Sequence, residues 1–89
     1  MNMEKISEFM DMEIYMHFNK YMPPFVILHY GSMRSLITIE SIEAISGNVP
    51  NRQTKIAMGW VGLHQRELLE LWERMLAGLK LSTVEPLKG

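Results

Sequence analysis

The chain has 89 residues, of which 47% are hydrophobic and 21% are charged, and its formal net charge at pH 7 is −1. This composition is typical of a globular domain and excludes a disordered chain, while the balance of charge argues against a dedicated nucleic-acid binder. Cysteine is absent and no apolar run approaches the about 20 residues that span a bilayer, which excludes disulfides, thiolate chemistry and a membrane protein. We expect a single cytoplasmic domain over residues 1–89.

The first half of the chain predicts an antiparallel meander sheet over residues 12–46, preceded by an N-terminal segment over residues 1–11. Apolar and polar residues alternate strictly over residues 12–18, the pattern of a strand with one buried face. Pro23 and Pro24 end this strand because proline cannot donate to a sheet ladder. The next strand, residues 25–30, is apolar on both faces and is therefore expected to be central.

A tight turn and two further strands are predicted to complete the sheet. Gly31 and Ser32 suit a two-residue hairpin, in which glycine supplies the positive φ of a type II′ turn. A third strand is expected over residues 34–40 and a short fourth strand over residues 43–46. The fold class is therefore α+β, with three to four antiparallel strands.

The hydrophobic period changes from two to 3.6 over residues 51–77, which predicts one long amphipathic helix packed on the sheet. Gly59 and Gly62 each cost about 1 kcal/mol relative to alanine inside a helix, so a bend is expected near them. Residues 80–86 are expected to be extended and are a candidate for one more strand.

Three polar residues are weak candidates for catalysis: His29 on the central strand, Arg34 after the hairpin and His64 in the helix. Each is more often a surface or packing residue than a catalyst. A metal site needs at least three converging ligands, whereas the spacing of the histidines offers only pairs. We therefore predict no metal and no cofactor.

The predicted helix carries more apolar residues than one sheet can cover. Leu69, Trp72 and Leu76 share one face of the helix, because residues three and four positions apart are neighbours. Leu68, Leu71 and Met75 form a neighbouring face. One set is expected to pack on the sheet, and the first set is the predicted binding surface for a partner protein or a second copy of the chain. Burial of both sets inside a bent helix is the alternative.

The order of short motifs resembles a family of small bacterial proteins, domain-of-unknown-function family 4160, over nearly the whole chain. The motifs are "ISEF", "IYM-FN", "PP", "YG", "IE", "G-(V/L)P-R", "LHQ-ELLE-WE" and "EPL". The resemblance implies an α+β fold, a bacterial or phage origin and a place in predicted toxin–antitoxin or phage-associated gene pairs.

One departure from the family pattern bears on chemistry. The family usually has His-Asn-Pro-Pro-His-Phe-His where this chain has residues 21–27, so all three of those histidines are replaced. Phe25 and Ile27 can neither bind a metal nor transfer a proton. We therefore expect a non-enzymatic protein-interaction domain, with a small toxin acting on RNA or another cellular target as the alternative.

Overall fold

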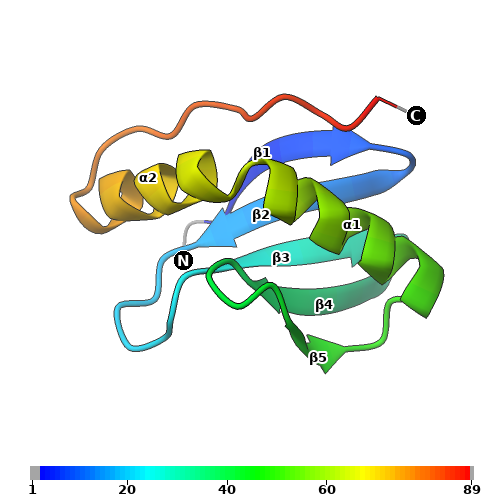
Figure 1. Cartoon of the computed structure of the whole chain (residues 1–89). Helices are drawn as coiled ribbons and strands as arrows, with labels where there is room; N and C mark the ends of the chain where they lie inside the picture. Colours follow the sequence, from blue (N-terminus) through cyan, green and yellow to red (C-terminus); the bar gives the residue numbers. More distant parts are fainter. Residues whose placement is uncertain (1–2, 89) are drawn as a thin grey trace.

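The computed structural model describes residues 3–88 and contains one five-stranded antiparallel sheet and two helices (Figure 1). The strands lie side by side in chain order, which confirms the predicted α+β meander. The elements are β1 (Met3–Phe9), β2 (Met12–His17), β3 (Phe25–Tyr30), β4 (Met33–Thr38), β5 (Ala44–Gly47), α1 (Asn51–Leu63) and α2 (Gln65–Leu76).

The sheet has five strands where three to four were predicted, and the additional strand is β1, within the segment that was expected only to precede the sheet. A β-bulge between Lys5 and Ser7 places Ile6 and Ser7, which are consecutive, both in the interior. This interrupts the alternation by which a strand is detected. The turn after β1 has positive φ at Met10 (49°) and Asp11 (64°), so no glycine indicates it.

The strands β2 and β3 agree with the pattern of the sequence. The three side chains Met12, Ile14 and Met16 are fully buried on one face of β2. The strand β3 is the middle strand of the sheet, and Gly31 has the positive φ (62°) that the predicted hairpin requires.

Two helices replace the single helix that was predicted, and the break lies at His64 rather than at the glycines. His64 has φ −116° and ψ 22°, outside the helical region, whereas Gly59 and Gly62 remain inside α1. The two side chains between these glycines, Trp60 and Val61, are fully buried. Their burial outweighs the cost of glycine in a helix, and the turn at His64 lets both helices lie on one face of the sheet.

The core lies between the sheet and the two helices, which cover the same face (Figure 1). No helix within residues 3–88 is long and apolar enough to cross a membrane. The buried apolar residues are Ile6, Phe9, Met12, Ile14, Met16, Phe25, Val26, Leu28, Ile37, Ile39, Val49, Ala57, Trp60, Val61, Leu68, Leu71, Trp72 and Val84.

The C-terminal segment runs along the free edge of β1, as Figure 1 shows, but forms no strand. The Val84 N–H donates to the Ile6 carbonyl at 2.7 Å, and the Val84 side chain is buried. Trp60 Nε1–H of α1 donates to the Glu85 carbonyl at 2.9 Å. These two bonds hold the segment over the edge of the sheet and against α1.

Candidate functional site

The face of the sheet opposite the helices carries a regular array of partly exposed side chains. Cross-strand partners point to the same side of a sheet. The register pairs Glu13 with His29 and His29 with Arg34, which forms one row across β2, β3 and β4. A second row consists of Tyr15, Ile27 and Leu36. We call these six residues the open face.

The structure brings two of the three candidate catalytic residues together on this face. His29 and Arg34 are cross-strand neighbours, and the Tyr15 and His29 rings have centroids 4.4 Å apart. His64 lies in the helical layer, where its Nδ1 is 3.3 Å from Glu67 Oε1. The three residues therefore form no common site.

The surroundings of His29 favour its neutral form. Burial lowers the pKa of His29 below its ordinary value of 6.5, the positive charge of Arg34 lowers it further, and Glu13 opposes the shift. Its Nε2 atom is buried and has no hydrogen-bond partner among residues 3–88. On the same face, the Tyr15 hydroxyl donates to Glu13 at 3.2 Å, and burial, followed by this bond, raises the pKa of Tyr15.

A pH dependence of stability follows from the lowered pKa of His29. The unfolded chain binds a proton at His29 near pH 6.5, whereas the folded chain binds it only at lower pH. The contribution of His29 to the free energy of unfolding should therefore be constant above this value and fall on acidification toward the folded pKa. In a His29→Gln variant, the free energy of unfolding should fall less on acidification than in the wild type. Urea unfolding on both sides of pH 6.5 measures this difference. Equal acid sensitivity of the two proteins would contradict the prediction.

Within the described part of the chain, no group of three or more His, Asp or Glu side chains is placed to hold a metal ion.

The predicted partner-binding face of the helix is only partly at the surface. Trp72 is 3% exposed, and its ring centroid lies 5.3 Å from that of Phe25. Leu69 is half-buried, while Leu76 is 39% exposed. The large indole completes the core beside Phe25, so Leu69 and Leu76 are the members of this face that a partner can reach without unfolding the domain.

Leu76 borders a hollow of about 270 Å³ at the end of α2. Phe18 and Leu79 also border it, with 46% and 52% of their surfaces exposed. Phe18 was predicted to be buried in the strand 12–18, but β2 ends at His17. We call this the apolar hollow, and its lining residues are Glu4, Phe18, Met75, Leu76, Gly78, Leu79 and Leu81.

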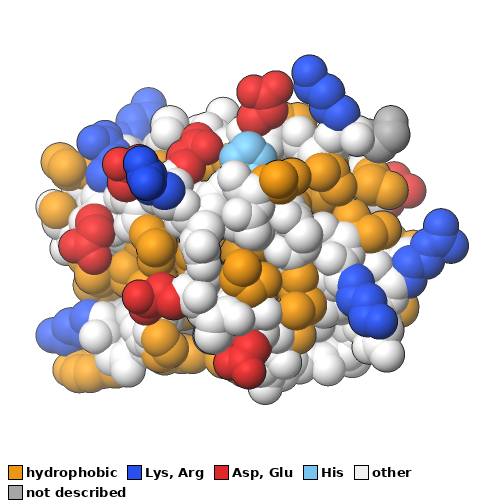
Figure 2. Space-filling view, in the orientation of Figure 1, with side chains coloured by type: hydrophobic (Ala, Val, Ile, Leu, Met, Phe, Trp, Pro, Cys, Tyr) orange, Lys and Arg blue, Asp and Glu red, His pale blue; other side chains and the backbone are white. Residues whose placement is uncertain are grey.

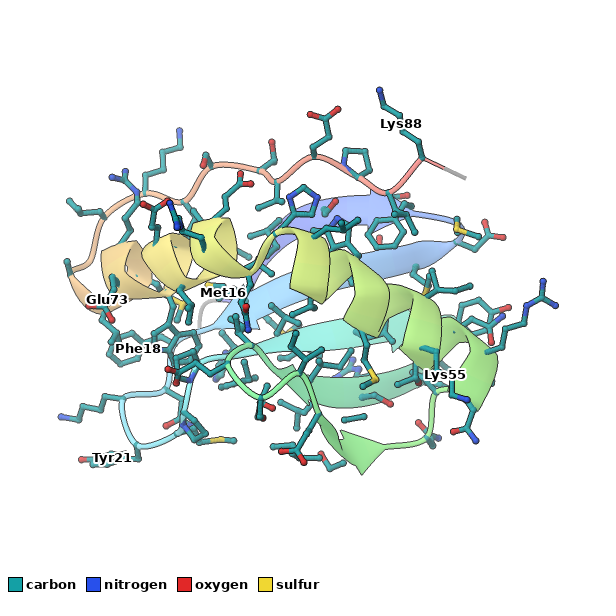
Figure 3. All side chains as sticks on the ribbon, in the orientation of Figure 1. Met16, Phe18, Tyr21, Lys55, Glu73 and Lys88 are labelled. Carbon is teal, nitrogen blue, oxygen red and sulfur yellow. The ribbon has the colours of Figure 1, made fainter. Side chains whose placement is uncertain are left out.

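The views of the surface agree with this description. Figure 2 shows apolar side chains exposed at the end of the molecule where α2 finishes, with acidic side chains among them. Figure 3 shows Phe18 and Glu73 at that same end. Neither Phe18 nor Leu79 belongs to the regular helical pattern, so periodicity alone did not select them as a surface.

These features define a small α+β domain with one open sheet face and an apolar hollow beside its second helix. The chain belongs to the family described as "Domain of unknown function (DUF4160)", whose sequence model matches residues 12–73. The match extends from the start of β2 into α2 and leaves out β1 and the C-terminal segment. A search of curated proteins and a search of solved structures gave no match.

Proposed function

We propose that the protein is a non-enzymatic interaction domain that binds a partner protein at the apolar hollow. The observation that carries this proposal is the exposure of three large apolar side chains, Phe18, Leu76 and Leu79, around one concave site. Scattered exposed apolar residues are common on monomers, whereas a cluster around a hollow is typical of a binding surface. The setting that we propose for such a domain is a toxin–antitoxin-like or phage accessory system.

The hollow also indicates the chemistry of the partner. Its walls include leucine, methionine and phenylalanine side chains, from which a large apolar side chain of a partner can displace water with a gain in free energy. Glu4 is the charged residue in its lining. A partner segment with an apolar anchor and a neighbouring Lys or Arg therefore fits this site.

A toxin acting on RNA is the second candidate function, and the cross-strand neighbours His29 and Arg34 favour it. An imidazole and a guanidinium side by side can transfer a proton and bind a phosphate. We rank it second because the third candidate, His64, lies in the helical layer near Glu67. Retained growth arrest by a His29→Gln, Arg34→Gln double variant would exclude these residues as its basis.

The interaction is tested with the product of the adjacent gene as the probe. A Leu76→Lys, Leu79→Lys double variant should bind that product at least about tenfold more weakly, because it places charge inside an apolar contact. A matched control is Leu63→Lys, which changes a 72%-exposed leucine at the end of α1. Affinity is measured by isothermal titration, with circular dichroism to show that each variant is folded.

Three outcomes would contradict the proposal. The first is the absence of binding between the wild-type protein and the adjacent gene product at high micromolar concentration. The second is full affinity in the folded double variant, which would place the contact elsewhere. Equal loss in the Leu63→Lys control would also remove the case for the hollow.

A further inference from the structure

The open face is a large surface of the sheet that nothing among residues 3–88 covers, since both helices lie on the other side (Figure 1). The two edges of the sheet are protected. The C-terminal segment covers β1, while β5 is short and contains a bulge opposite Leu36 and Ile37. Short, bulged or covered edges resist pairing with another strand. Association of the sheet is therefore favoured through its face rather than through its edges.

The two charged residues of the open face, Glu13 and Arg34, lie on opposite sides of the central strand, and Glu13 is also 3.4 Å from Lys5 Nζ on the edge strand β1. Glu13 lies on β2, the neutral His29 on β3 and Arg34 on β4, in one cross-strand row. The guanidinium of Arg34 is exposed and makes no salt bridge or hydrogen bond with the described residues. In the second row, Ile27 on β3 lies between Tyr15 and Leu36.

We propose that the open face binds a second copy of this chain, with a twofold axis parallel to β3. Such an axis exchanges the positions over β2 and β4 and leaves β3 opposite itself. Glu13 of each copy then faces Arg34 of the other, and Tyr15 faces Leu36, while Ile27 meets its own equivalent. Twofold contacts are the commonest contacts between identical subunits.

The spacing of packed sheets is compatible with these contacts. Two sheets pack face to face about 10 Å apart, a gap that a glutamate and an arginine extending from opposite sides can close. A twofold axis across the strands would instead place the charged row over the apolar row. That arrangement would bury the Arg34 guanidinium without a partner, which is costly, whereas Glu13 would keep only the Lys5 ammonium 3.4 Å away. The charge pattern therefore selects the axis along β3.

The state of His29 supports the same arrangement. The proposed axis brings the two His29 rings of the dimer near each other. Within each copy, the ionisable neighbours of His29 are Glu13 and Tyr15 on β2 and Arg34 on β4. Burial and Arg34 already lower the pKa of this histidine. Neutral rings can approach each other, whereas two imidazolium groups would repel.

Charge reversal tests the proposal on the full chain. The mass of the wild-type protein in solution, measured by sedimentation equilibrium, should correspond to two chains. Glu13→Arg alone and Arg34→Glu alone should each weaken self-association on the order of 100-fold, because like charges meet twice across the axis. The double variant Glu13→Arg, Arg34→Glu should restore the two-chain mass, because each new arginine faces a new glutamate.

Two controls separate this surface from others. Glu70→Arg makes the same change of charge at an exposed position of α2, on the other side of the sheet, so the two-chain mass should persist. The Leu76→Lys, Leu79→Lys variant should also remain a dimer, because the apolar hollow lies outside the open face. Its partner affinity still tests the proposed function independently.

The proposal is overturned if the wild-type protein has the mass of one chain at high micromolar concentration. It is also overturned if the folded charge-swap variant stays monomeric, or if a dimer dissociates only when the apolar hollow is changed. Circular dichroism confirms folding in each case, and Arg34→Glu alters a side chain that holds no described contact in the monomer.

Discussion

Replacing Gly47 by alanine is expected to lower the free energy of unfolding by about 3 kcal/mol or more, through overpacking and backbone strain. A Cβ atom at this position would overlap the Arg34 carbonyl oxygen and the Ser35 Cα atom, which belong to the neighbouring strand β4. Gly47 also has φ 124°, a conformation that other residues rarely adopt. Backbone atoms of a sheet cannot move aside as a flexible side chain can, so β5 should separate from β4.

Gly59→Ala is the matched control, and its expected effect has the opposite sign. Gly59 lies in the exposed part of α1, and a Cβ atom there would meet no other atom within 4 Å. Alanine should therefore raise the free energy of unfolding by about 0.5–1 kcal/mol. Urea denaturation of the wild-type protein and both variants measures the two effects. Equal stability of Gly47→Ala and the wild type would refute the close packing of β5 on β4.

Among changes in the core, Trp60→Ala is expected to lower the free energy of unfolding most, by about 3–5 kcal/mol. Trp60 is fully buried, and its ring centroid lies 5.4 Å from that of Phe9 on β1. Its indole N–H also holds the C-terminal segment through the Glu85 carbonyl. Because the stability of a small domain is only about 5–15 kcal/mol, this variant should be largely unfolded at moderate urea concentration.

Trp60→Phe separates the two roles of this side chain. Phenylalanine keeps an aromatic ring in the core but lacks the N–H group that binds the Glu85 carbonyl. Loss of this hydrogen bond should lower the free energy of unfolding by about 1 kcal/mol, and the smaller ring should lower it further. Amide hydrogen exchange at Val84 should rise more than exchange in β3. Equal exchange at Val84 in both proteins would show that Trp60 does not hold the segment.

The parts of the fold that the sequence predicts correctly are those governed by local patterns. Alternation specified β2, and an unbroken apolar run specified the central strand β3. Gly31 indicated the hairpin between β3 and β4 through the conformation that glycine permits. Each of these signals depends on near neighbours along the chain and not on tertiary contacts.

The errors arose where tertiary packing decided the structure. The bulge at Ile6 removed the alternation of β1, and burial of Trp60 kept the glycine-rich stretch of α1 helical. Helical periodicity does not state which face meets the sheet, so the sequence left open whether Trp72 lies at a partner surface or in the core, where the structure has it. The row of Glu13, His29 and Arg34 depends on strand register, which one sequence does not display.

The hydrogen bond between Val84 and Ile6 has a consequence for how the protein is made. The two residues lie far apart in the sequence, so β1 is synthesised well before the segment that covers it. During translation the growing chain therefore exposes an unprotected strand edge for most of its synthesis. Chaperone binding to the nascent chain during this interval should therefore raise the yield of folded protein.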